Sequence, residues 1–236
     1  MDSWRSNSRE GSSALALLLS IGLLAGALPA QAADCPTNGI EKPGFTYSSV
    51  SPTYQTTPVT SWGRTVYDGW DLTSGVVRIH HWGGLGNSVV HASDLYDVTG
   101  VAPGTKVTVI LRMDVAAWAA TDGCGGTGCA GYVGGQITTP EQTRYRYGIG
   151  STFGGLVGFG FYVDTPLTLT AGTPVPVSFM IEAHRTAGGN HEADGVGTFR
   201  FLGLSNGQAV VSCQGYRDPS TPALPASWGG VKALYR

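Results

Sequence analysis

The sequence predicts an all-β protein, in which a single domain forms an antiparallel β-sandwich of jelly-roll type with long glycine-rich loops. Three observations support this fold class. Beyond the first 32 residues, no stretch keeps apolar residues at a helical period for three turns, whereas alternation of apolar and polar residues is common. The chain also has 36 glycines and only 13% charged residues, a balance that favours pleated sheets and loops over helices.

Residues 1–32 form a predicted secretory signal peptide, which we exclude from the fold. A polar start with Arg5 and Arg9 precedes an apolar run over 14–30, which is shorter than the ~20 residues of a membrane-spanning helix. The run ends in the A-Q-A of residues 30–32, a typical cleavage pattern. We therefore expect a secreted protein, periplasmic or extracellular, with no membrane span after cleavage.

Alternating segments follow one another through residues 33–214, the predicted sandwich domain. In 106–115, apolar residues at alternate positions share one face, with Thr108, Arg112 and Asp114 on the other. The predicted strands are, in chain order, 44–49, 64–70, 75–82, 88–93, 106–115, 142–149, 157–164, 175–185, 197–204 and 208–215. Residues 215–236 contain three prolines and predict an extended tail without a hydrophobic anchor.

Two predicted strands share one pattern. In both segments a strand follows a Gly-Thr turn, and two valines occupy the same positions of the strand. The segments are PGTKVTVILRM (103–113) and AGTPVPVSFMI (171–181). Two explanations of the shared pattern remain open: the same turn-and-strand chemistry used twice, or two corresponding strands in the two halves of a sandwich. In the second case, the glycine-rich loops after both strands leave the sandwich at the same end, where binding sites tend to lie.

The four cysteines predict two disulfides. All of them follow the signal peptide, and an even count in an oxidising compartment indicates disulfide bonds. Three pairings are possible, and we favour Cys124–Cys129 with Cys35–Cys213, because Cys124 and Cys129 lie close together in DGCGGTGCAG. A metal knuckle would need a second close pair, and the C-x-x-C of a redox motif is absent.

Five residues near the end of strand 175–185 form the best candidate metal site. Carboxylates with imidazoles can hold Ca²⁺ or another divalent cation. The spacing matches no established metal motif, so we expect an ordinary solvated loop with no cofactor, and a bound divalent cation is the alternative. The residues are Glu182, His184, His191, Glu192 and Asp194.

Two adjacent histidines lie in the predicted strand 75–82. Neighbouring strand residues point to opposite faces, so His80 and His81 cannot both ligate one ion without a bulge. We expect one near the core and the other outside, beside Arg78 and Trp82.

Aromatic residues are the best candidates for ligand contact. Exposed Trp or Tyr rings can stack on sugar rings, although most aromatic residues belong to a core. Trp118 and Tyr132 flank the cysteine-containing loop and are therefore predicted to bind ligand. We group them with Glu182, His184 and His191 as candidate binding residues.

The strand segments APGTKVTVILRMDV, AGTPVPVSFMIEA and GTFRFLGLSNGQAVVSCQGY carry a resemblance. Over residues 60–214 they resemble the β-sandwich modules of secreted bacterial proteins, including those that bear a PEP-CTERM sorting tail. The resemblance rests on turn glycines, V-x-V strands and a closing V-x-S-x-x-G-Y. It implies export and a sandwich fold, but no catalytic residues. The Pro-Glu-Pro sorting tail is not found in this sequence.

We expect a non-enzymatic extracellular binding or matrix module, binding a polysaccharide or envelope surface through loops at one end of the sandwich. The net charge of −2 leaves no electrostatic footprint for nucleic acid. One alternative is a secreted glycan-active hydrolase or lyase, which would need two carboxyls from the region 182–194 across a cleft. A structural subunit of a surface assembly is the other alternative.

Overall fold

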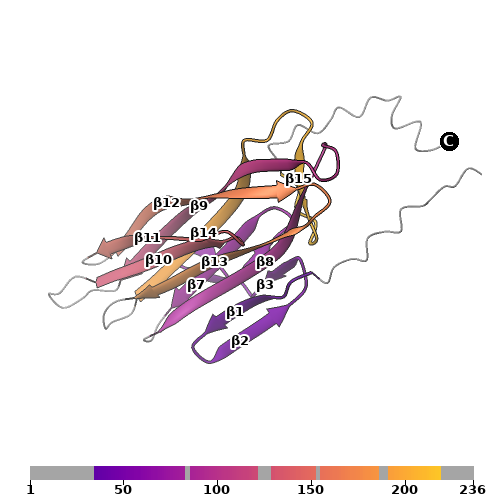
Figure 1. Cartoon of the computed structure of the whole chain (residues 1–236). Helices are drawn as coiled ribbons and strands as arrows, with labels where there is room; N and C mark the ends of the chain where they lie inside the picture. Colours follow the sequence, from indigo (N-terminus) through magenta and orange to yellow (C-terminus); the bar gives the residue numbers. More distant parts are fainter. Residues whose placement is uncertain (1–34, 83–85, 122–128, 153–154, 186–190, 219–236) are drawn as a thin grey trace, which may run out of the picture. The chain divides into compact units, whose positions relative to one another are not determined.

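The computed structural model describes residues 35–82, 86–121, 129–152, 155–185 and 191–218. Within these residues the regular structure is β throughout, and two antiparallel sheets pack face to face (Figure 1). The predicted antiparallel sandwich is therefore confirmed. The described residues include no helix of the length and apolarity that crossing a bilayer requires. The predicted signal peptide lies outside them, as does the tail from residue 219 on.

Sheet A holds seven of the strands in the described residues. Across the sheet they run in the order β11 (Thr143–Thr152), β10 (Cys129–Thr138), β13 (Val175–Arg185), β8 (Asn87–Thr99), β1 (Asn38–Lys42) and β2 (Phe45–Ser49), with β15 (Ala209–Ser212) also paired to β8.

Sheet B holds six strands of the same described residues. They run in the order β12 (Gly155–Thr170), β9 (Lys106–Thr121), β14 (His191–Leu202), β7 (Val76–Trp82), β6 (Gly69–Asp71) and β3 (Thr53–Gln55). A separate two-stranded hairpin is formed by β4 (Val59–Ser61) and β5 (Arg64–Val66).

The core lies between the sheets and follows the predicted alternation. In β9, Leu111 and Met113 are fully buried two residues apart. In β13, Phe179 and Ile181 are buried in the same way, and Phe179 stacks on Phe199 of β14 with ring centroids 3.9 Å apart. The apolar face of each central strand is thus buried against the other sheet, which leaves alternate residues of each strand on an outer face.

The strand ends that flank residues 83–85, 122–128, 153–154 and 186–190 gather at one end of the sandwich (Figure 1). Thr121 at the end of β9 pairs with both Gly155 and His191, and Gly131 of β10 pairs with Arg185 at the end of β13. We call this the loop end. Strands β9 and β13, which share the Gly-Thr pattern, end there together but belong to different sheets.

A disulfide joins Cys35 to Cys213, as the sequence predicts, with their Cα atoms 5.8 Å apart. Because it closes a loop across a sequence separation of 178, the chain-entropy model gives it about 4–5 kcal/mol. The predicted Cys124–Cys129 bond lies outside the described residues. Tyr216 is fully buried, so the sandwich includes residues beyond the predicted boundary at 214.

Candidate functional site

The predicted metal-site residues of β13 lie on the outer face of sheet A. Ile181 and Ala183 are fully buried in the core, so the side chains between and after them point the other way. Glu182 and His184 are accordingly half-buried on the outer surface. Their neighbours across the strand pairing are Gly134 and Tyr132 of β10.

The predicted metal-site residues of β14 lie on the outer face of sheet B. A side chain at Gly195 would collide with Val133 and Ile181 of sheet A, so Gly195 faces the core. Glu192 and Asp194 therefore point away from sheet A. The side chain of His191 is outside the described part of the chain. Strands β13 and β14 are consecutive in sequence, but their carboxylates project from opposite faces of the sandwich.

This placement separates the proposed metal ligands into two groups that cannot converge on one ion. In the described residues, no group of three or more His, Cys, Asp and Glu side chains is arranged to hold a metal ion. Glu182 likewise cannot face Glu192 or Asp194 across a cleft, as a pair of glycosidase carboxyls would.

On the outer face of sheet A, three tyrosines lie side by side close to the loop end. Tyr132 of β10 contacts His184 through its ring and meets Tyr147 of β11 edge to face, with centroids 5.7 Å apart. The ring of Tyr145 lies 6.2 Å from that of Tyr147. Tyr145 is 43% exposed and Tyr147 is 54% exposed. We call Tyr132, Tyr145, Tyr147, Glu182 and His184 the tyrosine strip.

The strip is shaped by a glycine and held by a hydrogen bond. A Cβ at Gly134 would lie 2.5 Å from the hydroxyl oxygen of Tyr145 and 2.9 Å from Oε1 of Glu182, so only glycine lets these side chains meet above the strand. The Tyr145 hydroxyl donates to Glu182 Oε1 at 2.6 Å. The pKa of Tyr145 is raised, first by burial and second by this hydrogen bond, so the hydroxyl stays protonated and can act as a donor.

On the outer face of sheet B, the β4–β5 hairpin covers the strands near the loop end. Val66 of β5 packs with Trp118 and Ala120 of β9 in a second apolar cluster, and the Arg64 guanidinium lies 5.8 Å from the Trp118 ring. The Ser61 hydroxyl donates to Glu192 Oε2. Trp118, predicted to bind ligand at the surface, is only 4% exposed and belongs to this interior cluster.

Two titratable side chains are buried beneath the hairpin, directly opposite each other on β7 and β14. Asp194 is 6% exposed and His80 is 7% exposed. Burial raises the pKa of Asp194 to about 7, against the opposing effect of Arg78. Burial, together with the charge of Lys42, lowers the pKa of His80 to about 4. Both groups are therefore pushed toward their neutral forms.

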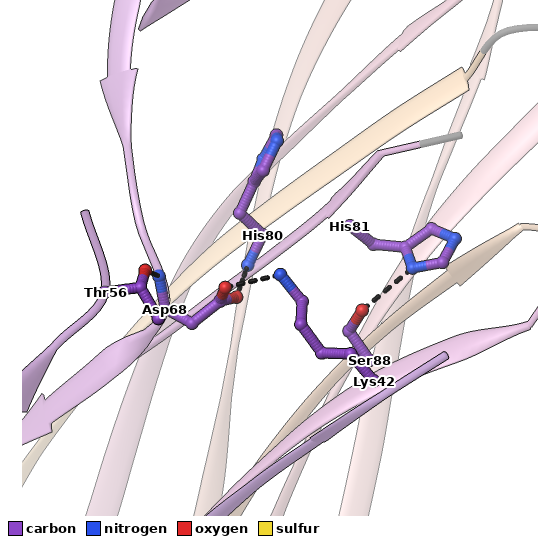
Figure 2. A network of polar contacts seen from close by, with 6 residues as sticks. All are labelled: Lys42, Thr56, Asp68, His80, His81 and Ser88. Atoms are coloured by element: carbon purple, nitrogen blue, oxygen red, sulfur yellow. Dashed lines mark hydrogen bonds and ion pairs between the residues drawn. The ribbon is translucent and has the colours of Figure 1, made fainter. Parts of the chain in front are cut away.

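A pocket of about 680 Å³ opens beside the hairpin at the loop end. On its wall, Lys42 forms an ion pair with Asp68 Oδ2, while Asp68 Oδ1 accepts a hydrogen bond of 2.7 Å from the backbone N–H of His80. Figure 2 shows this network and, separately, the contact of His81 Nδ1 with the Ser88 hydroxyl at 2.8 Å.

Both adjacent histidines line this pocket, and both are buried. The expectation that one of them lies outside is therefore wrong. The outer-facing His80 is covered because the β4–β5 hairpin lies over its side of sheet B, a contact made by residues distant in sequence. Trp82, two residues later on the same face, is 68% exposed at the pocket.

The sequence identified part of the tyrosine strip. Tyr132, Glu182 and His184 of the tyrosine strip were predicted, and the alternation of Tyr145 and Tyr147 with arginines was the signal that could have added the other two. The pocket was missed, because Lys42, Asp68 and Ser61 belong to short strands and turns without a motif.

Comparison with known protein families finds no family model that matches the sequence, and comparison with curated proteins finds no significant match. Function is therefore inferred from the arrangement of the side chains.

Proposed function

We propose that this protein is a secreted extracellular module that binds polysaccharide through the tyrosine strip on the outer face of sheet A. The observation that carries the proposal is the row of adjoining tyrosines, two of them largely exposed, on a sheet face at the loop end. Contiguous exposed aromatic surface is typical of an interaction site rather than of an ordinary solvated face. The Cys35–Cys213 disulfide supports export, because such bonds persist in oxidising compartments.

The strip combines what a polysaccharide needs from a binding surface. Tyrosine rings offer flat apolar faces to the C–H side of a sugar, and their hydroxyls, with Glu182 and His184, offer hydrogen bonds to its hydroxyl groups. A sheet face has no walls, so a ligand that extends along it can be a polymer rather than a chain end. Binding without catalysis is favoured because Glu182 has no second carboxylate facing it in the described residues of this surface.

The test is to measure binding of the purified protein to a panel of insoluble and soluble polysaccharides, by pull-down and affinity electrophoresis. Tyr147→Ala should weaken binding to the retained polymer by roughly tenfold, the scale set by about 1.4 kcal/mol. Tyr145→Phe, which keeps the ring but loses the hydrogen bond to Glu182, should weaken it by only a few-fold.

Tyr162→Ala is the matched control. Tyr162 is 46% exposed, but its ring is covered by the guanidinium groups of Arg112 and Arg146, at 4.3 and 5.3 Å, and it belongs to sheet B. Its removal should leave polysaccharide binding unchanged. Equal losses in Tyr147→Ala and Tyr162→Ala, or no polymer retained by the unaltered protein, would contradict the proposal.

A further inference from the structure

The pocket beside the β4–β5 hairpin is a second feature with the properties of a ligand site, and it lies away from the tyrosine strip. Its volume of about 680 Å³ is in the range of small-molecule pockets. It is formed by four parts of the chain: the β1–β2 turn, the hairpin with its flanking residues, the end of β7 with the start of β8, and the start of β14.

Three donor–acceptor pairs line this pocket. They are the Lys42–Asp68 ion pair, the Ser61–Glu192 hydrogen bond and the His81–Ser88 hydrogen bond. A hydroxyl group is at once a donor and an acceptor, so it is best recognised by a wall that offers both functions next to each other. Adjacent hydroxyls on one ring would meet such a wall at several points.

The charges in the pocket disfavour an ionic ligand. Asp68 and Glu192 place two carboxylates on the wall, which repel phosphate, sulfate or a uronic acid. Asp68 is already paired with Lys42 and Glu192 accepts from Ser61, so each carboxylate has a partner within the protein before an amine arrives. Among the described residues, no group of three or more His, Cys, Asp and Glu side chains is placed to hold a metal ion. A neutral polar ligand satisfies all three conditions.

A further observation points to a ligand. Trp82, at 68% exposure, presents a large aromatic surface where the pocket meets solvent, and a sugar ring stacked on it would cover that surface.

We propose that this pocket binds one neutral polyhydroxylated ring, such as a single sugar unit at the end of an oligosaccharide. The ligand class is related to that of the tyrosine strip, but the two sites use different residues and different faces. The pocket is recessed between the β1–β2 turn and the hairpin, which suits a single unit, whereas the strip lies on an open sheet face that accommodates an extended chain. Loss of binding at one site would therefore leave binding at the other site unchanged.

The test is isothermal titration calorimetry of the purified protein with neutral mono- and disaccharides of glucose, galactose, mannose, xylose and N-acetylglucosamine. Glucosamine and glucuronate serve as the cationic and anionic comparators. At least one neutral sugar should bind saturably, and at least tenfold more tightly than both charged sugars. The proposal is overturned if none of the neutral sugars binds saturably, or if a charged sugar binds more tightly than the neutral ones.

Variants locate the binding. Trp82→Ala changes an exposed side chain and should therefore fold, and it should weaken sugar binding by roughly tenfold. Ser61→Ala, which removes one donor, should weaken it by about two- to tenfold. Tyr147→Ala, on the other face, should leave this affinity unchanged while weakening polymer binding. Full affinity in Trp82→Ala, or its loss in Tyr147→Ala, overturns the assignment to the pocket.

Discussion

On the outer face of sheet A, Glu182 and His184 lie beside exposed tyrosines, whereas on the outer face of sheet B, Glu192 and Asp194 lie beneath the β4–β5 hairpin. Both pairs occupy alternate positions near the loop end of a central strand. The face of sheet A leaves its polar groups available to a partner. The face of sheet B buries them, and the chain itself supplies the cover.

The difference teaches that strand alternation fixes the direction of a side chain but does not fix its environment. Outward-facing side chains of β10, β11 and β13 remain at least partly accessible to solvent near the loop end. The outward-facing side chains of Trp118, Glu192 and Asp194 are instead buried, because residues 59–66 fold back over this part of sheet B. Burial then decides the chemistry, because it pushes ionisable groups toward their neutral forms.

The largest expected effect compares the two aromatic residues that flank residues 122–128. Trp118→Ala should destabilise the protein by about 3–5 kcal/mol, because it removes a buried ring between sheet B and the hairpin. Tyr132→Ala should cost about 1 kcal/mol, because its ring is half-buried on an open face. Denaturant unfolding measures both. Equal costs would mean that the hairpin does not cover sheet B.

A smaller effect is expected from Asp194, through the dependence of stability on pH. Its folded pKa of about 7 lies above the ordinary 3.8, so the folded state keeps a proton that the unfolded state releases first. Stability is thus fully present below pH 3.8 and falls as the pH rises to about 7. The total fall from this group is roughly 2–4 kcal/mol.

Asp194→Asn removes this titration and should unfold at a higher temperature than the unaltered protein at pH 8, with the gain shrinking toward pH 4. Glu182→Gln, the matched change on the open face, should alter stability by under about 1 kcal/mol. Thermal unfolding at several pH values measures both. A gain in Asp194→Asn that is equal at pH 4 and pH 8 contradicts the buried acid.

The strands and their faces could be predicted from the sequence because they depend on local alternation. The buried positions of β9 and β13 follow from a period of two within single segments, and the Cys35–Cys213 disulfide follows from the cysteine count and the proximity of the other pair. The tyrosine strip could be predicted in part, because Tyr132 flanks the cysteine-containing loop and Glu182 and His184 share one face of a predicted strand.

The covering hairpin and the pocket could not be predicted, because they depend on contacts between distant parts of the chain. Strands β3 to β6 are three residues long, too short to show a period. The proposed cluster from Glu182 to Asp194 failed for a related reason. Residues close in sequence were expected to converge, but the chain changes sheets between β13 and β14, which sends their outward side chains to opposite faces.

The smallest of the three effects concerns His80, and its sign opposes that of Asp194. Its folded pKa of about 4 lies below the ordinary 6.5, so on acidification the unfolded state takes up a proton first. The stability from neutral His80 is present above pH 6.5 and is lost as the pH falls to about 4. The loss is roughly 2–3 kcal/mol.

His80→Gln should therefore reduce the loss of stability between pH 6.5 and 4, which thermal unfolding measures. The imidazole of His80 should titrate near pH 4 by NMR. On acidification, the contribution of Asp194 to stability rises over the range in which the contribution of His80 falls. The two contributions therefore partly cancel in the unaltered protein. In each single variant, the dependence of stability on pH should show the contribution of the remaining group alone. The double variant, which has lost both contributions, should again show little dependence on pH over this range. Unchanged slopes in both single variants would mean that neither group is buried beneath the hairpin in solution.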